Sequence, residues 1–189
     1  DWTAQTPRLH PVTGTRLDVA TFSEAKNNRL AFKEALQRCW LERTTLDSES
    51  PEARSLLQFA LPIVGELPQL TADFSHVTHL SLDGSHGTLG ADRFLRYFPR
   101  LQHLEIRSFN LGKVPQAVSV MPNLSQLILA ECSITLDDAA MTTLSGLTSL
   151  SALDLYRNPL GRAPDITNMP ALAYIDLGDT GIADLPNGL

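Results

Sequence analysis

LSALDLYRNPL, residues 150–160, is one of five similar segments in this chain. The other four read VTHLSLDGSHG from Val77, LQHLEIRSFNL from Leu101, LSQLILAECSI from Leu124 and LAYIDLGDTGI from Leu172. The five segments start 24, 23, 26 and 22 residues apart. Numbered from 1 to 11, they share apolar residues at positions 1, 4 and 6, and usually at position 11.

Recurrence at this period, with this apolar pattern, is the signature of leucine-rich repeats. Positions 4 and 6 alternate with polar residues as in a short strand, and the strands of successive repeats should stack in parallel. The side chains expected to point into the core are Leu80 and Leu82, Leu104 and Ile106, Leu127 and Leu129, Leu153 and Leu155, and Ile175 and Leu177. The sequence therefore predicts an α/β fold. Its expected form is a right-handed leucine-rich repeat solenoid, with parallel strands on the concave face and short helical or extended segments on the convex face.

Three parts are expected along the chain. Residues 1–20 form an irregular lead-in, and residues 21–66 form a helical cap over the open end of the repeats. Residues 67–189 form the leucine-rich repeat domain, with five repeats and short helices at 91–98 and 137–147. Because the chain lacks an initial methionine and stops part-way through a repeat, we expect it to be an excerpt of a longer protein.

Two helices are expected in the cap. The first begins at a capping box formed by Thr21 and Glu24 and runs to about Arg43. Its apolar face consists of Phe22, Ala25, Phe32, Leu36, Cys39 and Trp40. The second helix has Ser50 as its N-cap and is stopped by Pro62.

Composition and charge argue against several classes of protein. The 189 residues contain no run of about eighteen apolar residues, so no membrane span is expected. The net charge of −6 argues against nucleic-acid binding, which needs a basic surface. The two cysteines, Cys39 and Cys132, are too few for a disulfide framework and suit a reducing compartment. Since no catalytic motif is present either, we expect this chain to be non-catalytic and to bind no cofactor.

Two patterns resemble ligand sites but have plainer explanations. DGSHGTLG, which starts at Asp83, contains three evenly spaced glycines, but the spacing matches no nucleotide-binding loop and we interpret it as a turn. His79 and His103 share position 3 and should lie about 5 Å apart on neighbouring strands. Together with Asp83 they could hold a metal, but solvent-facing residues of such strands are also ordinary contact residues. No metal site is predicted.

Position 9 is expected to stabilise the turn that follows each strand. The residues there are Ser85, Phe109, Cys132, Asn158 and Thr180. A buried backbone group without a partner is costly, and a polar side chain at this position can pair with it. Cys132 is therefore interpreted as structural rather than nucleophilic, and Cys39 as part of the core. Phe109 departs from the pattern, and the neighbouring Asn110 is a candidate to replace its function.

The side chains that point outward from the predicted strands are mostly acidic. Residues 71–189 hold seven Lys and Arg against twelve Asp and Glu, a balance of −5. The outward set contains six acids and two arginines, a balance of −4, and two tyrosines that offer large contact area. This surface either binds a basic protein partner, which we favour, or only keeps the chain soluble. The predicted contact residues are Asp83, Glu105, Arg107, Glu131, Asp154, Tyr156, Arg157, Tyr174, Asp176 and Asp179.

Several short phrases resemble bacterial leucine-rich repeat proteins. They are FPRL at Phe98, MPNL at Met121, MPAL at Met169, NPL at Asn158 and LPNGL at Leu185. Together with the helical segment and DFSHVTHLSL from Asp73, they are similar to the repeat region of large secreted effectors of pseudomonads and enteric bacteria. In that family the repeats precede a novel E3 ubiquitin ligase domain.

The resemblance implies that this chain recognises the substrate of a ligase and restrains its activity. The family's catalytic cysteine lies in a Cys-x-Asp motif of a separate C-terminal domain, and neither Cys39 nor Cys132 matches that motif. Catalysis would therefore lie beyond Leu189. The implied location is a host cell's cytoplasm after secretion, with the bacterial cytoplasm as the alternative. A non-enzymatic adhesion or scaffold protein is the second hypothesis, and the sequence after Leu189 would separate the two.

Overall fold

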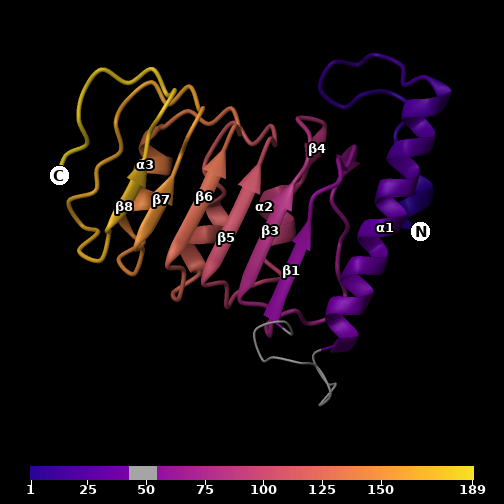
Figure 1. Cartoon of the computed structure of the whole chain (residues 1–189), viewed down its shortest axis with the longest axis horizontal. Helices are drawn as coiled ribbons and strands as arrows, with labels where there is room; N and C mark the ends of the chain where they lie inside the picture. The colour runs from indigo at the N-terminus through magenta and orange to yellow at the C-terminus, as the bar shows by residue number, and fades with distance from the viewer. Residues whose placement is uncertain (43–54) are drawn as a thin grey trace.

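A computed structural model describes residues 1–42 and 55–189 of the chain. In these residues, six parallel strands form a sheet in the order β1-β3-β5-β6-β7-β8, which follows the sequence (Figure 1). The strands are β1 (Leu56–Phe59), β3 (His79–Asp83), β5 (His103–Arg107), β6 (Gln126–Ala130), β7 (Ala152–Asp154) and β8 (Tyr174–Asp176). A separate parallel pair is formed by β2 (Gly65–Glu66) and β4 (Thr88–Leu89). The chain therefore has a mixed α/β fold.

Each of the five segments contributes one strand of the large sheet, and equivalent positions lie side by side. Position 4 runs across the sheet as Leu80, Leu104, Leu127, Leu153 and Ile175. From β3 to β7 the residues at positions 4 and 6 are at most 2% exposed, as predicted. In β8 the same positions are only half-buried, because β8 is the last strand of the sheet.

One face of the sheet is covered by short helical segments. These are α2 (Ala91–Leu95), the 3-10 helix η3 (Gln116–Val120) and α3 (Asp138–Ser145), which lie behind the strands in Figure 1. Phe94, Val118 and Leu144 are at most 1% exposed and belong to the core under the sheet. In the described part of the chain, no helix is both long and apolar enough to span a membrane.

The long helix α1 (Val19–Glu42) lies beside β1 at the N-terminal edge of the sheet (Figure 1). It begins before the predicted capping box, because the Asp18 carboxylate accepts a hydrogen bond from the Thr21 N–H at 2.7 Å. Asp18 therefore takes the capping role assigned to Thr21. The expected apolar face is correct, since Ala25, Phe32, Leu36 and Cys39 are buried.

The predicted second helix is wrong over residues 56–59, which form β1. Leu57 is 2% exposed and Phe59 packs against the core, whereas Leu56 and Gln58 point outward. This alternation is that of a strand, and β1 pairs in register with β3. This parallel pairing gives the main chain of β3 a hydrogen-bonding partner on the side away from β5. Ala60, which the predicted helix also included, is not helical, and residues 50–54, including Ser50, lie outside the described residues.

The lead-in is more ordered than expected. It contains the 3-10 helix η1 (Trp2–Gln5) and is attached to α1 through Arg29. The Arg29 guanidinium is buried and donates to Trp2 O at 2.8 Å and to Val64 O at 2.9 Å. It also lies 4.0 Å from the Trp2 ring centroid, and burial lowers its pKa. Arg29 thus joins the start of the chain to α1 and to the segment before β2.

Candidate functional site

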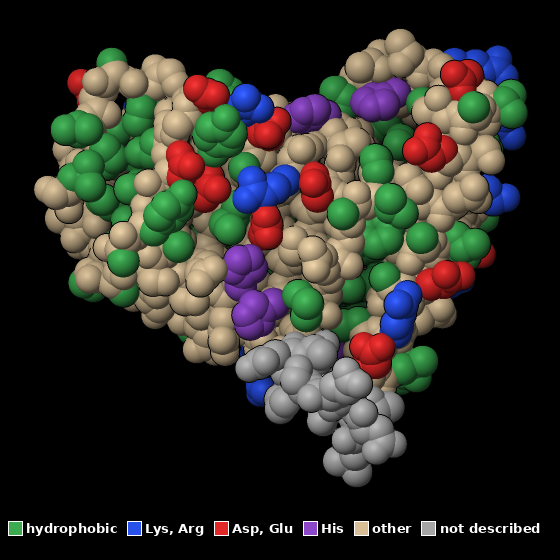
Figure 2. All heavy atoms as spheres, in the orientation of Figure 1, with side chains coloured by type: hydrophobic (Ala, Val, Ile, Leu, Met, Phe, Trp, Pro, Cys, Tyr) green, Lys and Arg blue, Asp and Glu red, His purple; other side chains and the backbone are tan. Residues whose placement is uncertain are grey.

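The second face of the sheet carries no helix in the described part of the chain and faces the viewer in Figures 1 and 2. We call it the open face. It is formed by the side chains at positions 3, 5 and 7 of the five segments, with the position 8 residues along its rim. Figure 2 shows acidic and basic side chains in contact over the middle of this surface, with histidines beside them.

Arg107 organises the centre of the open face. Its guanidinium donates to the Glu105 carboxylate on the same strand and lies 4.0 Å from Asp154 Oδ2, two strands away. Ser81 Oγ also donates to Glu105, at 3.1 Å. Although burial acts to raise the pKa of Glu105, the hydrogen bond and charge of Arg107 lower it below its usual range. Arg107 is therefore the local counterion of two predicted contact residues.

Arg157 is the counterion of two carboxylates at the rim of the open face. Its guanidinium lies 3.3 Å from Asp179 and 3.7 Å from Glu131, and it stacks 5.0 Å from the Tyr156 ring centroid. Glu131, Arg157 and Asp179 occupy position 8 and all have a positive φ, between 52° and 57°. A shared left-handed turn therefore brings side chains from three successive segments to one line along the rim.

Asp154 and Asp176 lie directly opposite each other on β7 and β8. One oxygen of each carboxylate accepts a backbone hydrogen bond of 2.8 Å, from Tyr156 N and Gly178 N respectively. The Tyr174 hydroxyl lies 3.5 Å from the other oxygen of Asp176. Two carboxylates and an aromatic ring thus meet at the C-terminal end of the open face.

All ten predicted contact residues lie on the open face or its rim. The structure adds residues that the sequence analysis left out of this set, because Ser81 and His103 contact Glu105 and because β1 extends the surface. A signal for β1 was present in the sequence. Pro68 follows Leu57 by eleven residues, the interval between position 4 and a proline in three of the five segments.

The two position 3 histidines are neighbours, as predicted. The rings of His79 and His103 stack with centroids 5.8 Å apart and an angle of 18° between the planes. His103 Nδ1 lies 2.7 Å from Gln126 Oε1, and Thr78 Oγ1 lies 2.8 Å from His79 Nδ1. Among residues 1–42 and 55–189, no group of three or more His, Cys, Asp or Glu side chains is arranged to hold a metal ion.

Both cysteines are buried and poorly suited to nucleophilic chemistry. Burial raises the pKa of the Cys39 thiol to about 11 and that of Cys132 to about 12. Cys132 Sγ instead lies 3.2 Å from Ala130 O, which agrees with the structural function predicted for position 9. The raised pKa values and the burial of both thiols therefore disfavour the thiolate form near neutral pH.

The glycine-containing loop after β3 has a packing explanation. A Cβ at Gly84 would overlap the Phe109 ring, so the loop needs glycine to accommodate this aromatic side chain. Phe109 is 1% exposed and fills the core at position 9. The proposed replacement, Asn110, forms no side-chain hydrogen bond to any described residue. The loop then continues into β4 through a turn.

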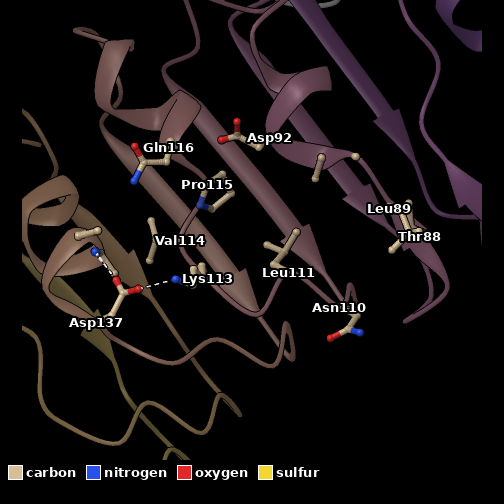
Figure 3. Close-up of a pocket in the computed structure, with 14 residues that line it drawn as sticks. Thr88, Leu89, Asp92, Asn110, Leu111, Lys113, Val114, Pro115, Gln116 and Asp137 are labelled. Carbon is tan, nitrogen blue, oxygen red and sulfur yellow. Dashed lines mark hydrogen bonds and ion pairs between the residues drawn. The ribbon is translucent and has the colours of Figure 1, made fainter. Parts of the chain in front are cut away.

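A cavity of about 320 Å³ lies on the helical side of the sheet (Figure 3). Its charged residues already have partners. Lys113 Nζ lies 2.7 Å from Asp137, as the dashed line in Figure 3 shows. Asp92 accepts a hydrogen bond from Ala117 N at 2.8 Å and pairs with Arg96. The cavity therefore offers a ligand less unpaired charge than the open face does.

No model of a known protein family matches this chain, and no curated protein sequence matches it.

Proposed function

We propose that this chain is a protein-recognition module built as a leucine-rich repeat solenoid, and that its partner binds across the open face. The asymmetry of the sheet supports this most directly. One face is packed under α2, η3 and α3, while the other presents charged and aromatic side chains from five strands. Parallel sheets usually have both faces covered, and in repeat proteins an uncovered strand face is the usual binding surface.

The size of the open face suits a macromolecule. Neighbouring strands lie about 4.8 Å apart, so five of them span roughly 19 Å, and three outward positions per strand span roughly 13 Å. The backbone ladders hold these side chains in a fixed array, which lowers the entropy cost of binding. An ordered, shallow and charged surface of this size fits a folded protein or a peptide better than a small molecule.

On the sequence resemblance, we further propose that the module selects the substrate of a secreted bacterial E3 ubiquitin ligase acting in a host cell. On this proposal the ubiquitin-transferring cysteine lies outside this chain, because Cys39 and Cys132 are both buried and the pKa of each thiol is raised. The test is ubiquitin-chain formation by the protein that contains this chain, with activating and conjugating enzymes and ATP. Cys39→Ser and Cys132→Ser should leave chain formation intact. If no ubiquitin chains form with any conjugating enzyme, the ligase function is rejected. The proposal of a binding module would still stand.

Site-specific photo-crosslinking tests the binding surface itself. A photoreactive residue replaces Ile128, which lies between Glu105 and Asp154 on the open face, or Ser119, which is exposed on η3. Both proteins are irradiated in host-cell extract, and the crosslinked species are identified by mass spectrometry. We expect a defined partner from position 128 and none from position 119. The same partner from 119 alone, or equally from both, would show that the open face is not the binding surface.

A further inference from the structure

We propose that the open face receives a basic polypeptide segment, and that a lysine or arginine of this segment binds at the β7–β8 end, against Tyr174, Asp154 and Asp176. In this arrangement Arg107 is an internal counterion and not a contact for the partner. The inference rests on the proposed recognition function and specifies the chemistry of its partner.

The charge balance of the open face favours a cationic partner. Its six acids and two arginines leave a net charge of −4. Each arginine already lies between two acids, Arg107 between Glu105 and Asp154, and Arg157 between Glu131 and Asp179. In the described part of the chain, Asp83 and Asp176 have no basic side chain within 4.0 Å. The negative charge that remains unpaired is thus available to a partner.

The β7–β8 end combines this charge with a geometry that a single cation would stabilise. Asp154 and Asp176 are direct cross-strand neighbours, and like charges in this position repel. Their backbone hydrogen bonds from Tyr156 N and Gly178 N hold the two carboxylates side by side. Arg107 approaches only Asp154, at 4.0 Å. A cation from a partner, placed between the two carboxylates, would relieve the repulsion that Arg107 leaves.

Two tyrosines make the same place suitable for a long basic side chain. Tyr174 is 55% exposed, and its hydroxyl lies beside Asp176. The Tyr156 ring packs over Gly178, where a Cβ would lie 3.1 Å from the ring. Aromatic faces attract ammonium and guanidinium groups, and the aliphatic part of lysine or arginine packs on them. Because Arg157 already stacks on Tyr156, the exposed ring of Tyr174 is the one that favours lysine or arginine over an inorganic cation.

Backbone amides report on this site directly. The probe is an acetylated, amidated octalysine peptide, added to 15N-labelled protein and followed by NMR. The amides of Tyr156 and Gly178, which donate to Asp154 and Asp176, should shift on titration. The matched controls are the amides of Ala117 and Ala140, which donate to Asp92 and Asp137 on the helical side at the same 2.8 Å. Equal shifts in both pairs would indicate nonspecific attraction and overturn the proposal.

Three variants separate the functions of the charges. Asp176→Asn should weaken octalysine binding by about fivefold, because it removes the unpaired carboxylate. Arg107→Gln should strengthen it, because it removes a competing internal cation. Asp138→Asn, on the helical side with its carboxylate 99% exposed, should leave it unchanged. Affinity that is equal in all three variants would overturn the proposal.

Failure of the basic-segment inference can be distinguished from failure of the recognition function. If the crosslinks from position 128 identify a partner whose affinity is insensitive to Asp176→Asn and to Arg107→Gln, the recognition function stands and the basic-segment inference fails. If the partner crosslinks from position 119 alone while octalysine binds as expected, the proposed binding surface fails and only the cationic site stands.

Discussion

The Asn158 side chain pairs with backbone groups of two neighbouring segments. It is fully buried, and its hydrogen bonds measure between 2.6 and 3.2 Å. Its partners are the N–H groups of Cys132 and Ile134 and the carbonyl oxygens of Leu129, Leu155 and Tyr156. One side-chain amide thus pairs with backbone groups that would otherwise be buried without partners. These groups lie where two neighbouring segments turn away from the sheet.

Replacing Asn158 by alanine should lower the free energy of unfolding by about 3 kcal/mol, because several buried backbone groups lose their partners at once. Urea denaturation followed by circular dichroism measures the change. Asn110→Ala is the matched control, since the Asn110 side chain is partly exposed and forms no hydrogen bond with the described residues. Asn110→Ala should lower the free energy of unfolding by less than about 0.5 kcal/mol. Equal losses in the two variants would show that Asn158 does not hold the turn.

At the scale of elements, β1 shows how a strand and a helix are distinguished by alternation. Leu56 and Leu57 are adjacent in sequence, but Leu56 is 44% exposed and Leu57 is 2% exposed. Register with β3 places Leu57 beside Leu80 in the core, while Leu56 lies beside His79 on the open face. A strand therefore assigns different environments to two identical neighbours.

Leu57→Ala should lower the free energy of unfolding by about 3 kcal/mol, because it leaves a cavity in the core. Leu56→Ala should cost less than about 1 kcal/mol, since it removes a side chain from a largely solvated position. Thermal and urea unfolding of both variants check the difference. Similar costs at the two positions would contradict the register of β1 against β3.

The strands β3, β5, β6, β7 and β8 were predictable because each lies in a segment with apolar residues two apart and a regular period. β1 was not predicted, since a four-residue segment with three apolar residues fits a helix as well as a strand, and its pairing with β3 is a tertiary effect. Seven of the ten predicted contact residues follow from the alternation of strand side chains. The other three, at position 8, reach the rim through a left-handed turn. The ion pairs of these residues were not predictable, because the sequence does not determine which of several nearby acids Arg107 reaches.

Across the whole molecule, carboxylates fix the ends of elements by accepting hydrogen bonds. Asp18 and Asp73 accept backbone N–H groups, from Thr21 and Ser75 respectively, and these bonds lower the pKa of each carboxyl. The pKa of Asp137 is lowered by Lys113 and by the N–H of Ala140 at the start of α3. These three carboxyl groups therefore bind protons less tightly in the folded chain than in the unfolded chain.

These depressed pKa values predict how stability depends on pH. A carboxyl whose pKa is lower in the folded than in the unfolded chain stabilises the fold above its unfolded pKa, near 4. That stabilisation is lost as the pH falls through the folded pKa. The free energy of unfolding should thus be nearly constant between about pH 7 and pH 5 and decrease progressively below about pH 4.5.

Urea midpoints measured at several pH values check this predicted profile. Glu105→Gln, which removes the carboxylate paired with Arg107, should reduce the difference between neutral and acidic pH. An unfolding free energy that rises on acidification would contradict the proposed contribution of these carboxylates.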